Sequence, residues 1–190
     1  LTSAATYAYE FSWSPDGTRI AFTGAPPPGD NNWWVAKLYV QNAQPDAIAS
    51  VVVDPSTVKG SLHGLQMALP RWSPDGKSIG FIEGLMSDEG FHGGDLFTVS
   101  TAGHDVVNRT PKRKGSVSSL FWTTPDRILF TEYVGGGSAI SELTLANNSV
   151  RTIWKAAEGF HAFGNFPNFA LSKDGKAAAG VRSNYETSPE

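Results

Sequence analysis

One short phrase recurs along the chain and limits what the chain can fold into. It reads Trp-Ser-Pro-Asp-Gly at positions 13–17 and again at 72–76. A shortened form, Trp-Thr-Thr-Pro-Asp, stands at 122–126, and an altered form, Leu-Ser-Lys-Asp-Gly, stands at 171–175. Successive copies begin 59, 50 and 49 residues apart. A period of this length is typical of arrays of small β-sheets, so we expect a chain built of about four similar units.

Each copy of the phrase predicts a β-hairpin. Ser, Pro and Asp in succession suit a type I turn, and a following Gly can adopt the left-handed conformation that closes a hairpin. Alternating apolar pairs that suit a strand follow the first three copies: Ile20 and Phe22, Ile79 and Phe81, and Ile128 and Phe130. Small residues, Ala178 and Gly180, take these positions after the fourth copy. We therefore expect the fourth unit to be the least well packed.

The segments between the hairpins supply two more strands per unit. These strands are predicted at 37–40 and 50–53, at 95–99 and 105–107, and at 139–143 and 150–154. Four strands in about 40 to 50 residues make the blade of a β-propeller. We predict an all-β fold, a partial β-propeller of about three and a half four-stranded antiparallel blades, with almost no helix. The whole chain, 1–190, is then one propeller portion, with blades at about 5–54, 64–110 and 116–155 and an incomplete fourth blade at about 166–190.

The connections are predicted to divide between two faces. In an up-and-down blade, the first-to-second and third-to-fourth turns lie at one end of the strands, and all other connections lie at the opposite end. The long connections all belong to the second group: 24–34, 54–64, 84–94, 111–115, 133–138 and 155–165. Long loops on a rigid scaffold usually carry binding sites. We therefore expect one decorated face, which carries these connections, and one plain face.

Composition excludes several classes of function. A net charge of −3 gives no electrostatic basis for binding nucleic acid or an anionic membrane, and the one basic run, 112–114, is interpreted as a solvated loop. The chain has no cysteine, which excludes disulfides, thiolate metal sites and a cysteine nucleophile. No apolar run approaches the roughly 20 residues that span a bilayer. These features leave the compartment open, with periplasm and cytoplasm both compatible, and no cofactor is predicted.

The repeated hairpin resembles a known repeat. Trp-Ser-Pro-Asp-Gly followed by an Ile-x-Phe strand looks like the TolB-type propeller repeat, which also occurs in the propeller of the prolyl oligopeptidase family of serine peptidases. The segment Phe-Ile-Glu-Gly-Leu-Met-Ser-Asp-Glu-Gly at 81–90, followed by Gly-Gly-Asp-Leu at 93–96, is similar to a stretch in bacterial members of that family. Those members include the acylaminoacyl-peptidase-like and dipeptidyl-peptidase-like branches. The resemblance implies a propeller that caps an α/β-hydrolase domain and gates or positions peptides for it.

The catalytic part of such a peptidase is not found in this sequence. A nucleophile elbow needs Gly-x-Ser-x-Gly, and the sequence around Ser138 lacks the closing Gly. The four histidines, at 63, 92, 104 and 161, fall in predicted loops without a serine partner or zinc-binding spacing. No catalytic residue and no metal ligand is therefore predicted, and this chain alone should not hydrolyse peptides. The resemblance implies as partners the rest of the propeller, an α/β-hydrolase domain in the same or another chain, and a peptide substrate.

Asp88 and Glu89 are the first candidates for substrate binding. In the dipeptidyl-peptidase branch, carboxylates on the propeller hold the free α-amino group of the substrate, because a buried ammonium needs paired charge. Adjacent acids in the resembling loop suit that role. The alternative is a pair of solvated acids in a Gly-bounded turn, and the loop departs from the paired-glutamate motif of that branch.

Trp33 and Trp34 are the second candidates. Adjacent aromatics on a long loop can line an apolar substrate pocket. The alternative is that one of them packs between blades. At the level of the whole chain two functions stay open: the non-catalytic propeller portion of a prolyl-oligopeptidase-family serine peptidase, or a TolB-like protein-interaction propeller without enzymatic activity.

Overall fold

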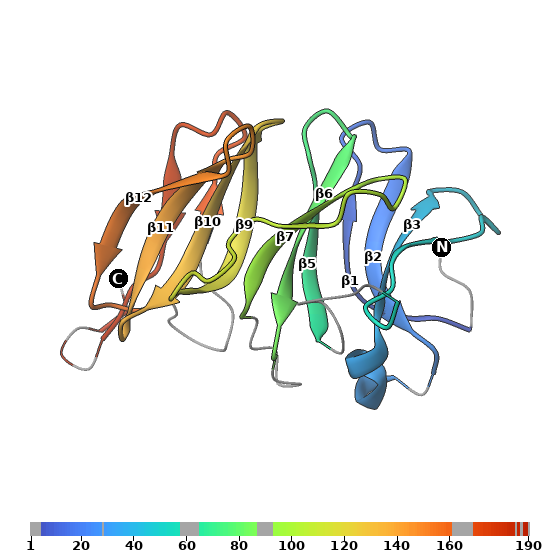
Figure 1. Ribbon diagram of the computed structural model, residues 1–190, viewed down its shortest axis with the longest axis horizontal. Coiled ribbons are helices and arrows are strands. Elements are labelled where there is room, and N and C mark those ends of the chain that lie inside the picture. Colours follow the sequence, from blue (N-terminus) through green and yellow to red (C-terminus); the bar gives the residue numbers. More distant parts are fainter. Residues whose placement is uncertain are drawn as a thin grey trace.

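The chain forms four antiparallel sheets in a row, as the computed structural model shows (Figure 1). The structure describes residues 5–27, 29–57, 65–86, 93–160, 169–184, 186 and 188–189. Three sheets have four strands in sequential order and the last has two, which confirms the predicted all-β partial propeller. We call these sheets the first to fourth blades.

The strands of the first blade are β1 (Tyr7–Trp13), β2 (Arg19–Ala25), β3 (Lys37–Asn42) and β4 (Ser50–Val53). Those of the second blade are β5 (Gln66–Trp72), β6 (Ser78–Gly84), β7 (Asp95–Ser100) and β8 (Val107–Asn108). Those of the third blade are β9 (Ser116–Thr124), β10 (Arg127–Val134), β11 (Gly137–Thr144) and β12 (Ser149–Ala156). The fourth blade has β13 (Phe169–Leu171) and β14 (Ala178–Gly180), and the one described helix is a 3-10 helix, η1 (Asp30–Val35).

The repeated phrase forms the same hydrogen-bonded turn in three blades. In the first blade the Ser14 hydroxyl donates to the Asp16 carboxylate at 2.6 Å and accepts from the backbone N–H of Arg19 at 2.9 Å. Gly17 follows with φ of +70°, the left-handed conformation that its position predicts. The same serine, aspartate and glycine contacts recur in two other turns, at 73–78 and 172–177.

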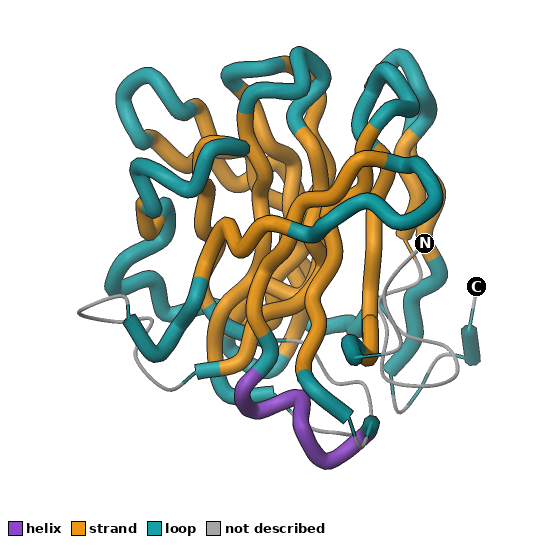
Figure 2. The backbone as a smooth tube through the Cα atoms, turned by 90° about the vertical axis from the view of Figure 1, so that its right-hand side faces the viewer, coloured by secondary structure: helices purple, strands orange, loops and turns teal. Residues whose placement is uncertain are grey.

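The short turns of the three complete blades gather on one face. On the plain face, the third-to-fourth turn of each complete blade donates a backbone hydrogen bond to its first-to-second turn, from Ala43 to Thr18, from Thr101 to Lys77 and from Leu145 to Asp126. Helix η1 lies at the opposite end of the strands, on the decorated face (Figure 2). No helix among the described residues is long and apolar enough to cross a bilayer.

The core lies between blades. Adjacent residues of β6 point to opposite sides, so Phe81 packs in a cluster with the first blade while Ile82 packs in a cluster that reaches Phe130 of the third blade. Both faces of the second blade are therefore covered. The fourth blade differs, because its strands have three residues each and every residue of β14 is exposed. This agrees with the small residues of the fourth copy.

Tryptophans of the repeat connect neighbouring blades. The indole N–H of Trp72 donates to the backbone carbonyl of Ser12 at 3.1 Å, and that of Trp122 donates to the carbonyl of Arg71 at 3.0 Å. In each case the acceptor precedes the tryptophan of the preceding blade. The tryptophan that opens the phrase therefore holds its blade against the preceding blade by the same indole hydrogen bond in both cases.

Candidate functional site

At the decorated end of the third blade, a tight turn joins β10 to β11. The connection at 133–138, which the sequence predicts to be long, is instead a two-residue turn, because Tyr133 pairs with Ser138 and Val134 pairs with Gly137. The central glycines, at 135 and 136, have φ of +62° and +82°. Only glycine adopts two such conformations in succession readily, which makes this tight turn accessible. The expectation of a long loop here is wrong, and the short turn leaves space above it.

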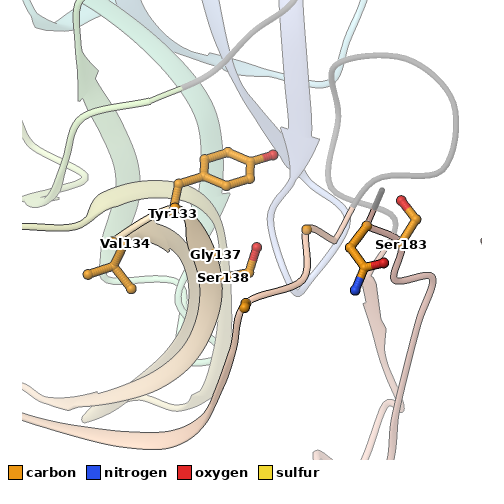
Figure 3. A pocket seen from close by; sticks show the side chains of 10 residues that line it. Tyr133, Val134, Gly137, Ser138 and Ser183 are labelled. Carbon is orange, nitrogen blue, oxygen red and sulfur yellow. The ribbon is translucent and has the colours of Figure 1, made fainter. Parts of the chain in front are cut away.

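A cavity of about 450 Å³ occupies that space. We call it the turn cavity. Tyr133 and Ser138 of the third blade lie on one side of it and Ser183 lies on the other (Figure 3). Two backbone hydrogen bonds between Gly159 and Ser183, at 2.9 and 3.0 Å, connect the two sides. Hydroxyl groups, glycine backbone and the amide of Asn184 line this cavity together with Val134 and Ala157, so it offers both polar and apolar contacts.

Two further cavities adjoin the first. The acidic cavity, of about 340 Å³, lies between the second and third blades and shares Tyr133 with the turn cavity. The arginine cavity, of about 230 Å³, shares Val134 with the turn cavity, and Lys114 and Gly115 with the acidic cavity. The three share lining residues, and we call them together the loop-face groove.

Two acidic residues from neighbouring strands, Glu83 and Asp95, are among the residues that line the acidic cavity. Glu83 at the end of β6 pairs in register with Asp95 at the start of β7. Asp95 accepts hydrogen bonds from Asn108 at 2.7 Å and from Thr110 at 3.1 Å. Glu83 is 3% exposed, and no described group bonds its Oε1 atom. Burial, with a smaller contribution from the nearby Asp95, raises the pKa of Glu83 to about 8.

The arginine cavity contains a satisfied ion pair. Arg113, from the connection between the second and third blades, donates from Nε to Glu132 Oε2 at 2.6 Å, and its Nη2 bonds Glu132 Oε1. Ser141 also donates to Glu132 Oε1, at 2.8 Å. The hydrogen bond and charge of Glu132 raise the pKa of Arg113, against an opposing effect of burial. This two-point pairing holds both side chains in one orientation.

The described residues of the groove carry hydroxyl, carboxyl and guanidinium groups. His104 lies in an exposed turn on the plain face, where its backbone N–H bonds Ser100. The other three histidines lie outside the described residues. Within the described ranges, no group of three or more His, Asp or Glu side chains could hold a metal ion. The charged and hydroxyl groups of the groove can form hydrogen bonds and ion pairs with a polar molecule.

Comparison with known proteins points to one kind of propeller. No protein-family model matches the chain. An uncharacterised peptidase of Bacillus subtilis strain 168, YuxL, is 27% identical over 134 residues, which is 68% of this chain and 18% of the relative. The chain thus spans less than a fifth of the length of that relative.

Solved structures match almost the whole chain. TolB from Acinetobacter baumannii has a TM-score of 0.65 at 21% identity, over 99% of this chain and 41% of TolB. The fold is that of a partial TolB-type propeller. A puromycin hydrolase matches with a TM-score of 0.64 at 15% identity, over 97% of this chain and 26% of its own. An oligogalacturonate lyase in complex with manganese matches with a TM-score of 0.72 at 12% identity, over 98% of this chain and 50% of its own.

Of the four site residues predicted for this TolB-type propeller, two lie outside the described residues and two do not line the groove. Asp88 and Glu89 lie outside the described residues. Trp33 of η1 is 8% exposed, stacks on Tyr9 and donates from its indole to the Met67 carbonyl at 3.4 Å, so it packs between the first and second blades. Trp34 is 56% exposed. Neither tryptophan lines the three cavities of the groove, and a substrate-binding role for these residues stays a prediction.

Sequence reasoning missed the charged residues of the groove. Glu83 and Glu132 stand at the same place in their repeats, two residues after the phenylalanine of the Ile-x-Phe strand. This shared position in the repeat is a signal in the sequence that marks both residues as candidates. Arg113 belongs to the basic run interpreted as a solvated loop, but it is half-buried in its pair with Glu132. Its role depends on a partner 19 residues away, and spacing alone does not reveal that contact.

Proposed function

We propose that this chain is the non-catalytic propeller portion of a prolyl-oligopeptidase-family serine peptidase. In this role its decorated face positions or gates peptides for an α/β-hydrolase domain outside the chain. The similarity to the Bacillus subtilis peptidase carries the proposal, because it extends over two thirds of this chain. The structural match to a puromycin hydrolase supports the same choice of scaffold.

The loop-face groove supports a role in peptide selection. Its turn cavity offers hydroxyl groups and glycine backbone, and two acidic residues, Glu83 and Asp95, line its acidic cavity. A peptide carries both a polar backbone and charged side chains, so it matches the two kinds of lining. The plain face carries the tight turns of the repeat.

A TolB-like interaction propeller is the second candidate. The match to TolB covers 99% of this chain and favours this alternative at the level of fold. In that case the same groove would bind a protein segment without any hydrolysis, and no serine nucleophile would be associated with the chain.

Labelling with a fluorophosphonate serine probe tests the choice between the two. The intact protein that carries this chain should be labelled, and the label should be lost after competition with a peptide substrate. The 190-residue chain alone should stay unlabelled. An intact protein that folds but does not react with the probe would contradict the peptidase function and favour the interaction propeller.

A further inference from the structure

The arginine cavity has an excess of positive charge that the chain as a whole lacks. The formal net charge of the chain is −3, yet three cationic side chains and one carboxyl group line this cavity. The cations are Arg113, Lys114 and Lys155, and the acid is Glu132. A concave site lined mainly by one sign of charge concentrates ions of the opposite sign.

The carboxylate of this cavity is already engaged. Two nitrogens of Arg113 bond the two oxygens of Glu132, and the Ser141 hydroxyl donates to Oε1 at 2.8 Å. Glu132 is 1% exposed. Its negative charge is therefore compensated inside the protein, and among the described ion pairs it has none with a lysine.

The two lysines have no anionic partner within the described part of the chain. Neither Lys114 nor Lys155 takes part in any of the ion pairs found there. Both residues are exposed, and Lys114 also borders the acidic cavity. Each ammonium is a compact positive charge with three donors. Two such charges therefore border one cavity without an internal counter-ion.

The position of Lys155 is fixed relative to the glycine turn at 135–136. Its Nζ atom lies 4.0 Å from the position that a Cβ atom on Gly135 would occupy, and a Cβ atom on Gly136 would meet nothing within 4 Å. The space over this turn is therefore open, with the Lys155 ammonium beside it. The backbone N–H groups of the two glycines donate none of the hydrogen bonds found among the described residues. Successive free N–H groups of a turn can bind an anion, so the turn adds donors next to the positive charge.

We propose that the arginine cavity and the adjoining glycine turn bind a carboxylate of a peptide ligand, with Lys114 and Lys155 as its cationic partners. The C-terminus of a peptide and an acidic side chain both present this group. The turn cavity shares Val134 with the arginine cavity, so a peptide bound in the turn cavity can reach the lysines. The inference rests on the proposed function in taking the ligand to be a peptide. The site itself requires no hydrolysis, so its test is a binding measurement.

Calorimetric titration of the intact protein with three N-acetylated tetra-alanine peptides tests the site. The first ends in a free carboxylate, the second ends in an amide, and the third ends in an amide and has one internal glutamate. Where the intact protein has a reactive serine, the fluorophosphonate probe blocks it first, so that binding is measured without hydrolysis.

We expect the first or the third peptide to bind roughly tenfold more tightly than the neutral amide, because its carboxylate forms charge-assisted hydrogen bonds. Tighter binding of the first peptide identifies a terminal carboxylate as the ligand group, and tighter binding of the third identifies an acidic side chain. Equal affinity of all three peptides would overturn the proposal. The same preference in a protein that does not react with the probe would contradict the peptidase function and support the carboxylate site.

Variants locate the site within the molecule. Lys114→Gln and Lys155→Gln should each reduce the preference for the carboxylate peptide roughly fivefold or more. Lys173→Gln is the matched control, because it removes the same charge from an exposed turn on the plain face, and it should leave the preference unchanged. Circular dichroism of each variant verifies the fold. Wild-type preference in both Lys114→Gln and Lys155→Gln would overturn the proposal, and so would an equal loss in Lys173→Gln, which would indicate general attraction between charges.

Discussion

The aspartate of the repeated turn illustrates how one side chain stabilises a hairpin. The hydroxyl of Ser14 has the largest effect on Asp16, followed by the backbone and hydroxyl groups of Thr18, and together they lower the Asp16 pKa to about 2. The pKa values of Asp75 and Asp174 are lowered as well, chiefly by Ser73 and Ser172. The ionised form of all three carboxyl groups is therefore more stable in the folded turn than in the unfolded chain.

The first prediction concerns acid sensitivity. A pKa lowered on folding adds stability that is complete above the ordinary value of 3.8 and is lost as the pH falls toward 2. Asp75→Asn should lower the free energy of unfolding by about 0.5–1 kcal/mol near neutral pH and by less near about pH 2.5, because stability that depends on the ionised Asp75 carboxyl declines once the pH is below the ordinary Asp value of 3.8. Urea unfolding followed by tryptophan fluorescence measures both values. An equal difference at the two pH values would contradict this explanation.

The second prediction concerns Glu83 and has the opposite sign. Its pKa is raised from 4.5 to about 8, so between these values the folded protein holds a proton that the unfolded chain has released. The free energy of unfolding of the ligand-free protein should therefore fall as the pH rises from about 5 to about 8. Glu83→Gln should remove this part of the pH dependence, as thermal unfolding across the range would show. Stability curves that change with pH in the same way for wild type and variant would refute the assignment of this pH dependence to Glu83.

At the scale of elements, contacts between blades matter as much as contacts within them. Trp72 and Trp122 each cover a blade surface and donate an indole hydrogen bond to the strand of the preceding blade. A phenylalanine preserves most of the apolar area but cannot donate that bond. The effect of the hydrogen bond can therefore be separated from the effect of burial.

The third prediction uses that substitution. Trp72→Phe should lower the free energy of unfolding by about 1–3 kcal/mol, because it leaves the Ser12 carbonyl without its partner and leaves a small cavity. Trp13→Phe is the matched control, since Trp13 is 50% exposed at the outer side of the first blade. The control should change stability by less than about 0.5 kcal/mol. Equal effects in the two variants, measured by urea unfolding, would contradict a special role for the buried indole.

Local chemistry made the hairpins predictable, and long-range pairing limited the rest. The turns at 14–17 and 73–76 follow from serine, aspartate and glycine a few residues apart. The apolar alternation of the sequence ends before the strands do, so it predicts a long connection at 133–138. Pairing between β10 and β11 in fact continues to Val134 and Gly137 and leaves only the turn at 135–136. Likewise, Glu83 and Glu132 stand at the same position of the repeat, and Glu132 alone of the two pairs with Arg113, which arrives from a separate connection.

At the scale of the whole molecule, the outer side of the first blade is apolar. Register places Phe11, Phe22, Tyr39 and Val51 in one row across the four strands, on the side opposite the contact with the second blade. Phe11 is 62% exposed. In the second and third blades the corresponding side is covered by the preceding blade. An exposed apolar sheet face of this kind is prone to association.

The fourth prediction tests that surface. In the 190-residue chain, a double variant, Phe11→Thr with Trp13→Thr, should bind less of the hydrophobic dye ANS than wild type and should scatter less light at high concentration. Val51 and the sheet hydrogen bonds remain in place, so the circular dichroism spectrum should be unchanged. Unchanged dye binding and scattering in the folded variant would show that this surface is not the cause of association.

The central claim is that the decorated face of the propeller handles the peptide while the plain face serves as scaffold. Photo-crosslinking of a peptide that carries a diazirine side chain to the intact protein, followed by mass spectrometric mapping, tests it most directly. The crosslinks should fall on the loop-face groove, in the turn at 133–138 and the connection at 113–116. Crosslinks concentrated on the plain-face turns at 14–17 and 73–76, with the groove unlabelled, would contradict the claim.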